Sequence, residues 1–281
     1  MTTELNSKYI QLQLILHELE SVVIGYSGGV DSTLLLKVAV DTLGEKAFGV
    51  IGKSETYPLR EYEEAERLAK SFGASYEVVY TEETDNLKFR ENPPDRCYYC
   101  KTELFSKLTD IAQARNIKWI CDGTNTDDLG DFRPGLKTVK EKNVRSPLLE
   151  AGFSKQDVRD LSRHLNLPTW DKQSFACLSS RFPYGFGIEK DKLKKIDAAE
   201  TLLRDSGFKY FRVRHHDENT VRIEVGKNEV ARFFDDGLRE TIVSEIKKLG
   251  FKYVTLDLEG YRTGSMNEVL SEEEKQAFDL G

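Results

Sequence analysis

The stretch Ser27-Gly28-Gly29-Val30-Asp31-Ser32 decides the fold of this chain. It follows an apolar run at residues 22–26, which predicts a buried strand, and it precedes residues 33–39, which predict a helix. The stretch is therefore expected to form a strand–turn–helix corner at the start of an α/β domain.

The residue types in this corner favour binding of a pyrophosphate. Gly28 and Gly29 allow the backbone to approach an anion closely. The N-terminus of the following helix offers unpaired N–H groups and a partial positive charge. Ser27 and Ser32 add hydroxyl donors. The alternative is an ordinary glycine-rich turn in which Asp31 is a common helix-start residue.

No lysine closes this loop, so it is not the GxxxxGK[ST] phosphate loop. It matches, residue for residue, the SGG-x-DS loop of the PP-loop ATP pyrophosphatase superfamily, which it resembles. The resemblance implies cleavage of ATP to AMP and pyrophosphate, with adenylation of a carboxylate or carbonyl oxygen. It also implies that Asp31 helps to hold Mg²⁺ or orders the loop.

Predicted strands and helices alternate through the first half of the chain. Strands are expected at 47–52, 75–80 and 118–121, and helices at 5–20 and 57–72. Such alternation predicts an α/β fold with a doubly wound parallel sheet, whose ligands bind at the carboxyl ends of the strands.

Two further residues are candidates for nucleotide contacts at this edge. Asp122 follows the strand at 118–121 and is expected to contact ribose or a metal, unless it only caps its own turn. Arg133 lies in a long loop and is expected to contact a phosphate, the alternative being a surface arginine.

The character of the sequence changes after residue 185. We expect a PP-loop domain at residues 1–185 and an α+β domain for substrate binding and oligomerisation at residues 186–281. The predicted elements of the second domain are a helix at 190–206, a hairpin of strands at 210–215 and 221–225, a helix at 228–249, a strand at 252–258 and a short helix from Ser271.

Composition limits the class of protein. The 281 residues are 39% hydrophobic and 32% charged, which suits a soluble globular protein. No apolar run is long enough to span a membrane, and the first twenty residues lack the pattern of a signal peptide, so a cytoplasmic location is expected. The net charge of −7 argues against nucleic acid as the main substrate.

The four cysteines are not expected to form disulfides in a reducing compartment. Cys97 and Cys100 have the spacing of a metal-binding or redox pair and are expected at the end of a polar loop. Cys177 lies in a second polar loop. Three thiolates meeting at the sheet edge would hold a [4Fe–4S] cluster with one open iron, the alternatives being dithiol or persulfide chemistry, or zinc. Cys121 ends an apolar strand and is expected to be a buried structural thiol.

Several motifs together resemble the LarE family. They are the PP-loop, Asp131-Phe132-Arg133-Pro134-Gly135, Cys177-x-x-Ser180-Arg181-x-Pro183-Tyr184-Gly185, and Tyr253-Val254-Thr255-Leu256-Asp257-Leu258-x-Gly260-Tyr261-Arg262-x-Gly264-x-Met266-Asn267. They span nearly the whole chain, and the last motif is much more specific than the PP-loop.

This resemblance implies a role in making the nickel-pincer nucleotide cofactor of lactate racemase. The family activates the carboxylates of pyridinium-3,5-biscarboxylic acid mononucleotide with ATP and replaces carboxylate oxygen with sulfur. Some members sacrifice the sulfur of one cysteine at the position of Cys177. Others hold a [4Fe–4S] cluster with three cysteines, and Cys97, Cys100 and Cys177 match that pattern.

The resemblance also implies roles for residues near the end of the chain. Arg212 and Arg214 would contact phosphate or carboxylate groups, as would Ser180 and Arg181. Glu200 and Glu224 would bind a divalent metal. Without such roles, Arg212 and Arg214 would lie on a solvated strand face, and the two glutamates would be ordinary surface charges. A homo-oligomer is also implied, whereas the sulfur donor is not identified.

Three other functions share some of these features. A tRNA thiolation enzyme has the same loop and often three cysteines, but usually carries an RNA-binding or zinc module that is not apparent here. An amide synthase of the GMP or NAD synthetase type leaves the cysteines unexplained. A nucleotide-binding regulator without turnover does not need the intact loop at residues 27–32.

Overall fold

The computed structural model describes residues 1–130, 134–173, 176–262 and 264–274. Two compact units divide the chain. Of the described residues, the first contains Met1–Glu83 and the chain from Asp95 to residue 173, and the second contains Thr84–Pro94 and the chain from Ala176 to residue 274.

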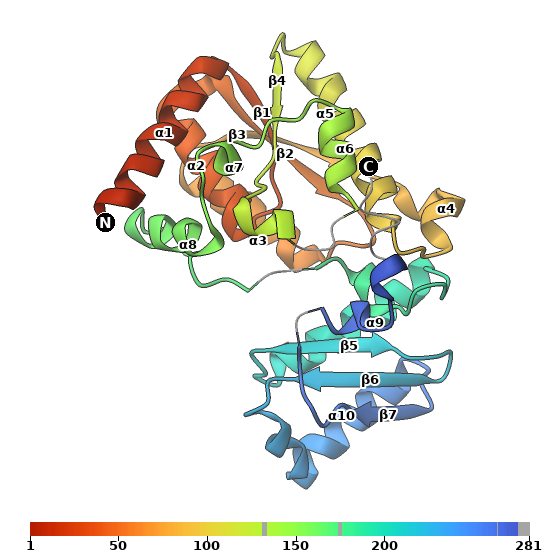
Figure 1. The fold of residues 1–281 in the computed structure, drawn as a ribbon. Helices are drawn as coiled ribbons and strands as arrows, with labels where there is room; N and C mark the ends of the chain where they lie inside the picture. Colours follow the sequence, from red (N-terminus) through yellow and green to blue (C-terminus); the bar gives the residue numbers. More distant parts are fainter. Residues whose placement is uncertain (131–133, 174–175, 263, 275–281) are drawn as a thin grey trace. The chain divides into compact units, whose positions relative to one another are not determined.

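A four-stranded parallel sheet forms the centre of the first unit (Figure 1). Its strands are β1 (Val22–Gly25), β2 (Ala47–Lys53), β3 (Ser75–Tyr80) and β4 (Trp119–Cys121), in the order β3-β2-β1-β4. All three pairings are parallel. The predicted α/β fold with a doubly wound parallel sheet is confirmed.

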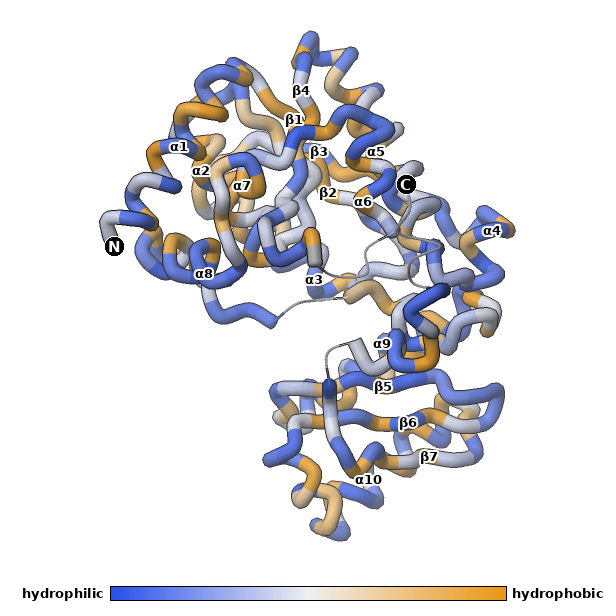
Figure 2. The backbone as a smooth tube through the Cα atoms, viewed as in Figure 1, coloured by the Kyte–Doolittle hydropathy of each residue, from blue (hydrophilic) through white to orange (hydrophobic). Residues whose placement is uncertain are grey.

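Helices cover both faces of this sheet, because successive side chains of a strand point to opposite sides. Val22 and Ile24 of β1 join a core with buried residues of helices α1, α2, α3, α7 and α8. Val23 joins a second core with residues of α5 and α6. The helices are α1 (Thr3–Leu19), α2 (Val30–Leu43), α3 (Leu59–Ser71), α5 (Arg96–Ala114), α6 (Leu136–Glu141), α7 (Pro147–Glu150) and α8 (Lys155–His164). In Figure 2, α1 alternates between hydrophobic and hydrophilic colours, as an amphipathic helix should.

Helix α5 corrects one expectation from the sequence. Cys97 and Cys100 were expected at the end of a polar loop, but they lie in the first turns of this 19-residue helix. Phe105, Leu108 and Ala112 recur at helical spacing and are buried against the second face of the sheet. The polar first turns concealed the helix, whose stability comes from this later apolar stripe.

The second unit is a small α+β structure. Its main elements are α4 (Leu87–Arg90), α9 (Lys190–Asp205), β5 (Phe211–His215), β6 (Thr220–Val225), α10 (Asp236–Lys248) and β7 (Tyr253–Leu256). Short 3₁₀ turns complete the chain at Gly44–Lys46, Glu83–Asp85, Thr126–Gly130, Leu178–Arg181, Val230–Phe234 and Ser265–Asn267. The predicted hairpin is confirmed, because β5 and β6 pair antiparallel.

The predicted helix at 228–249 is interrupted. A 3₁₀ turn at Val230–Phe234 precedes α10, and the Asp235 side chain accepts a hydrogen bond from the Leu238 N–H at 2.8 Å. An aspartate cap of this kind starts a new helix. The predicted capping box is present at the short terminal helix, where Ser271 and Glu274 each accept a hydrogen bond from the other's backbone N–H.

The two faces of the second sheet differ in chemistry. Val213, Val221 and Ile223 are buried on the face that α9 and α10 cover. The other face carries the charged side chains of Arg212, Arg214, Arg222 and Glu224, because these residues alternate with the apolar ones.

The expected domain boundary at residue 185 lies later than the division between the compact units. Residues 90–92 bind the chain at 182–188 within the second unit. Asn92 Nδ2 donates to the Pro183 carbonyl at 2.7 Å, and the Asn92 carbonyl accepts from Gly185 N–H at 2.9 Å. Hydrogen bonds between segments distant in sequence set this division, and composition does not reveal them.

His215 of β5 is buried among aromatic rings of the second unit. Its ring centroid lies 5.1 Å from that of Phe182 and 4.9 Å from that of Phe186, and Phe251 approaches edge-on at 5.6 Å. Burial lowers the pKa of His215, and the positive charge of Lys192 lowers it further. The folded state therefore favours the neutral imidazole.

We predict that this unit loses stability as the pH falls below about 6.5, the pKa of an unperturbed histidine. The unfolded chain then binds a proton that the folded chain resists, until the lower folded pKa is passed. Calorimetric melting between pH 7.5 and 5.5 measures the effect. His215→Phe should reduce the loss, whereas His216→Gln, at the exposed neighbouring position, should not. An unchanged pH dependence in His215→Phe would contradict the assignment.

Candidate functional site

The PP-loop connects β1 to α2 as predicted. Gly29 is the N-cap of α2, and no side chain caps this helix. The Ser32 hydroxyl accepts a hydrogen bond from Ser27 N–H at 3.2 Å and lies 3.2 Å from the Ser27 hydroxyl. The two serines thus brace the loop, and the N–H groups of the first helical turn are left for an anion.

The structure gives a second reason for glycine at position 28. Gly28 has a φ of +65°, and a Cβ there would lie 2.7 Å from Cβ of Ala65 on α3. Close packing of the loop on α3 therefore requires this glycine, in addition to the predicted approach of an anion. Position 123, after β4, also requires glycine, because a Cβ there would lie 3.0 Å from Ser32 N in the loop.

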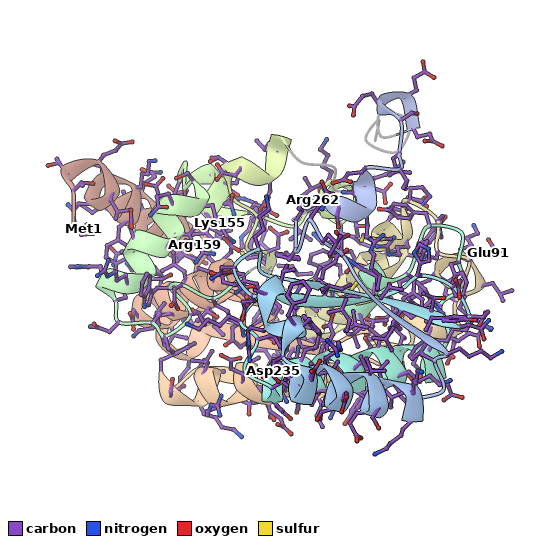
Figure 3. The ribbon with its side chains drawn as sticks, turned by 90° about the horizontal axis from the view of Figure 1, so that it is seen from below. Met1, Glu91, Lys155, Arg159, Asp235 and Arg262 are labelled. Carbon is purple, nitrogen blue, oxygen red and sulfur yellow. The ribbon has the colours of Figure 1, made fainter. Side chains whose placement is uncertain are left out.

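Asp31 is held from two sides by side chains far away in the sequence. Asn125 Nδ2 donates to Oδ1 at 3.0 Å, and Lys155 Nζ donates to Oδ2 at 2.5 Å. Asn125 follows β4, and Lys155 begins α8 (Figure 3). The carboxylate is thus oriented within the loop, and its role towards Mg²⁺ stays a prediction.

Other side chains support the backbone of the loop. Lys172 Nζ donates to the Gly28 carbonyl at 3.3 Å and pairs with Glu61 and Glu64 of α3 at 3.0 and 2.9 Å. The Tyr57 hydroxyl donates to the Ser27 carbonyl. Arg159 of α8, labelled in Figure 3, donates to the Lys172 carbonyl at 2.9 Å.

The described residues include Asp122 but not Arg133. Asp122 is buried beside the loop and accepts hydrogen bonds from the hydroxyls of Ser146 and Thr124, both at 2.7 Å. This bonding fits the turn-capping alternative, and a contact with ribose or a metal stays a prediction. Arg133 lies outside the described residues, together with Asp131 and Phe132 of its motif.

The cysteines fall into three environments. Cys97 is exposed and Cys100 is partly exposed, three positions apart on α5, whereas Cys177 belongs to the second unit. Cys121 is buried in β4, and burial raises the pKa of its thiol, as expected for a structural cysteine. Among the residues described, no three His, Cys, Asp or Glu side chains form a metal-binding group.

Cys100 lies beside a buried carboxylate in the first unit. Its Sγ is 3.9 Å from Glu83 Oε1, which also accepts hydrogen bonds from the hydroxyls of Ser54 at 2.7 Å and Thr56 at 2.6 Å. Glu83 was not predicted from the sequence. The arrangement places polar groups from the end of β2 next to the Cys-x-x-Cys turn.

Arg181 organises the loop of Cys177 in the second unit. Its guanidinium is fully buried and pairs twice with Glu200, at 2.8 and 2.9 Å. It also donates to the carbonyls of Ala176 at 2.6 Å and Cys177 at 3.1 Å. Burial by itself would lower the pKa of Arg181, but the charge of Glu200 outweighs it and raises that pKa.

This geometry bears on two residues that were predicted to contact ligands. Glu200 is fully buried, and its Oε1 accepts a further hydrogen bond from Val213 N–H at 3.1 Å. Both of its oxygens are therefore engaged by the protein itself. A metal bound by Glu200 and a substrate phosphate bound by Arg181 stay predictions, and this arrangement favours internal positioning for both residues.

Arg214 is also tied to the Cys177 loop. It pairs with Glu224 at 3.0 and 2.8 Å and donates to the Ser180 carbonyl at 3.1 Å. A further hydrogen bond reaches the Ser265 hydroxyl at 3.1 Å, within the long motif near the end of the chain. Arg222 shares the Glu224 carboxylate at 3.0 Å, so this glutamate is an ion-pair partner, and its metal role stays a prediction.

Arg212 lies 5.0 Å from the ring centroid of Tyr261, a cation–π distance. Burial and the nearby charge of Arg181 lower the pKa of Arg212 to about 10, so it remains a cation at neutral pH. Arg212 and Arg214 are 9% and 6% exposed. The alternative of a solvated strand face is therefore wrong for both.

Positive charge exceeds negative charge on this face of the sheet. Arg214 and Arg222 occupy directly opposite positions of β5 and β6, an arrangement that costs stability unless another group compensates. The carboxylate of Glu224 bridges the two, and Asp257 pairs with Arg222 at 3.5 Å. With Arg212 and Arg181 alongside, the cluster contains more guanidinium than carboxylate groups and suits an anionic ligand.

Several residues of these sites were missed from the sequence. Asn125 and Lys155 hold Asp31, and Tyr261 and Ser265 contact the arginines. The sequence did offer a signal for three of them. Asn125 lies in the polar stretch after a predicted strand, and Tyr261 and Ser265 lie in the most specific motif. Pairing of these residues with particular partners needed the fold.

No helix in the described part of the chain has both the length and the apolar character needed to cross a membrane. The NAD synthase family model matches residues 3–102, which include the PP-loop and the first cysteines.

Three relatives match most of the chain. A pyridinium-3,5-bisthiocarboxylic acid mononucleotide synthase of Lactiplantibacillus plantarum is 38% identical over 98% of this chain and 99% of its own. An uncharacterized protein of Synechocystis is 43% identical over 95% of this chain and 99% of its own. An uncharacterized protein of Methanocaldococcus jannaschii is 32% identical over 87% of this chain and 92% of its own.

These full-length similarities bear out the resemblance that the motifs indicated. The chain belongs to the family of pyridinium-3,5-bisthiocarboxylic acid mononucleotide synthases, the LarE family.

Proposed function

We propose that this protein is an AMP-forming, ATP-dependent sulfur transferase acting on pyridinium-3,5-biscarboxylic acid mononucleotide. The similarity to a named synthase over nearly its full length supports this substrate. The observation that carries the proposal is the second-unit cluster, in which Arg214 of the guanidinium-rich sheet face donates to the Ser180 carbonyl and Arg181 donates to the Cys177 carbonyl. The same arginines would therefore bind the anionic nucleotide and position the loop that carries Cys177.

The first unit supplies the features expected of an ATP site. The uncapped N-terminus of α2 offers N–H donors, and Gly29 and Gly123 keep side chains away from the loop. Asp31 supplies a carboxylate oxygen of the kind that Mg²⁺ prefers. The residues present therefore fit Mg²⁺ and a pyrophosphate group. When bound, Mg²⁺ would withdraw charge from the phosphate oxygens and make the α-phosphorus of ATP more electrophilic.

The reaction balances in two steps. A carboxylate oxygen of the substrate forms a bond to the α-phosphorus of ATP, and pyrophosphate leaves. A sulfur nucleophile then attacks the carbonyl carbon of the acyl-adenylate, and AMP leaves with the carboxylate oxygen. The bond between the sulfur and its donor then breaks, which releases the thiocarboxylate. Where the donor is Cys177, this is the Cβ–Sγ bond, and the Cα proton is lost with it. The arginines would hold the substrate phosphate, and water must be excluded from the adenylate.

We further propose that Cys97, Cys100 and Cys177 hold a [4Fe–4S] cluster, which would supply the sulfur. The donor set fits in chemical type, because Cys97 and Cys100 are accessible, lie three positions apart on one helical turn, and are joined in this role by the partly exposed Cys177. The alternative is sacrificial transfer from Cys177. A cysteine that holds iron cannot also give up its sulfur, so the two routes exclude each other.

Arg181 and Glu200 act, in this proposal, as positioning residues. Their paired side chains fix the carbonyl groups around Cys177 from within the core of the second unit. For Arg212 and Arg214 we propose binding of the anionic substrate instead. From the family resemblance, we also propose that the protein forms a homo-oligomer.

Cleavage of ATP is predicted to depend on the substrate and on Asp31. Pyrophosphate and AMP should be released only when the pyridinium dicarboxylate mononucleotide is present, as measured by coupled pyrophosphate detection and chromatography. Asp31→Asn should lower the rate by at least about tenfold, because an interaction made with a metal–phosphate group is lost. Asp41→Asn removes an exposed partner of Lys37 on the same helix and should leave the rate unchanged. Formation of ADP would contradict the proposal.

The iron content of the protein distinguishes the two sources of sulfur. Anaerobically purified protein should contain about four irons and matching acid-labile sulfide per chain. Cys97→Ala should lose them, whereas Cys121→Ala, at the buried structural thiol, should retain them. Absence of iron from the wild type, with a loss of H₂S from Cys177 after turnover, would establish sacrificial transfer instead.

The buried pair of Arg181 and Glu200 is predicted to stabilise the second unit. Glu200→Gln leaves the Arg181 guanidinium buried without its counter-ion, which should lower the free energy of unfolding by about 3–5 kcal/mol. Asp191→Asn, at an exposed pair with Lys194 on the same helix, should cost less than about 0.5 kcal/mol. Urea unfolding followed by circular dichroism compares them. Equal stability of the two variants would show that the pair does not hold the loop.

A further inference from the structure

Glu83 is a buried carboxylate that the proposed reaction does not use. It begins the 3₁₀ turn that follows β3, and it is only 2% exposed. Its Oε1 accepts hydrogen bonds from the hydroxyls of Ser54 at 2.7 Å and Thr56 at 2.6 Å. Its Oε2 is buried and has no hydrogen-bond partner among the described residues. Burial of a carboxylate with one oxygen unsatisfied is costly, and such a group needs an explanation beyond support of its own turn.

The carboxylate of Glu83 lies beside the Cys-x-x-Cys turn, within the first unit. Its Oε1 is 3.9 Å from Sγ of Cys100, in the first turns of α5. The preceding residue, Glu82, is also held to this helix, because its N–H donates to Oε1 of Glu103 at 2.7 Å. The distance between the carboxylate and the sulfur is therefore set by hydrogen bonds from two directions, the end of β2 and the helix itself.

A second carboxylate near the cysteines differs from Glu83 in its exposure. Glu141 accepts a hydrogen bond at 2.9 Å from the hydroxyl of Tyr98, which lies between Cys97 and Cys100 in sequence, but Glu141 is exposed to water. Water and salt screen a charge in that position. A buried charge acts through a lower dielectric constant, so the carboxylate of Glu83 has the stronger electrostatic effect on Cys100.

We propose that Glu83, acting through Cys100, lowers the reduction potential of the iron–sulfur cluster. This inference rests on the proposed function, in which Cys100 is a ligand of that cluster. Reduction adds an electron, and a buried negative charge beside one of the ligands opposes that addition. Glu83 thereby favours the oxidised form, whose greater positive charge attracts an anionic sulfur more strongly. Glu83 is neither a ligand nor a catalytic residue here, since it sets the charge around one ligand.

Anaerobic titration of the full-length protein with dithionite and redox mediators, followed by electron paramagnetic resonance of the reduced cluster, tests the effect of this charge. Glu83→Gln removes the charge but keeps the length of the side chain and an acceptor oxygen. At the midpoint potential of the wild type, it should raise the ratio of reduced to oxidised cluster by at least about tenfold, equivalent to about 59 mV for a one-electron couple. Glu141→Gln is the matched control and should change the ratio by less than about twofold, because its carboxylate is exposed.

A second variant separates the charge from a structural role. Glu83→Asp keeps the charge but shortens the side chain, so its ratio should stay within about threefold of the wild type. Iron per chain is measured for every variant, and Glu83→Gln should keep the content of the wild type. An unchanged potential in Glu83→Gln, loss of its iron, or equal shifts in the two variants overturns the inference while the proposed cluster stands. A wild type without iron overturns both.

Discussion

The tight corner between β1 and α2 is the constraint on which the first unit depends. Gly28 adopts a positive φ and packs against Ala65 of α3, so the loop, the parallel sheet and the next helix are fixed together. The two serine hydroxyls are used within the loop, which leaves the backbone N–H groups of α2 as the available donors. An anion site made of backbone is rigid, because its donors belong to a helix held by the core.

A different constraint governs the second unit, where charge is buried. Isolated buried charges are costly, and here guanidinium groups are compensated by two almost fully buried glutamates and, at Arg222, also by Asp257. The pairing leaves an excess of positive charge on one face of a small sheet, while aliphatic side chains on the opposite face supply the core. Arg181 and Arg214 connect that charge to the backbone around Cys177, so the geometry of the cysteine loop depends on the ion pairs beneath it.

Hydrogen bonds across long sequence separations also define the units themselves. Asn92 has a positive φ and uses both its side chain and its carbonyl to hold residues 182–185. A short segment that interrupts the first unit in sequence thus belongs to the second in structure. A boundary judged from composition falls at residue 185 because the polar, proline- and glycine-containing loop before it has no signature of the partner it binds.

The sequence by itself determined the parallel α/β fold, the PP-loop, the hairpin of β5 and β6 and the family, because strand–helix alternation and short motifs are local properties. It also placed Arg212 and Arg214 on one face, since residues two apart on a strand share a side. Only the tertiary structure decided that α5 begins at the Cys-x-x-Cys turn, that Arg181 and Glu200 are buried together, and that Lys155 reaches Asp31. The physical reason is that burial and ion pairing depend on which distant segments pack together, and the residues concerned lie 19 to 124 positions apart.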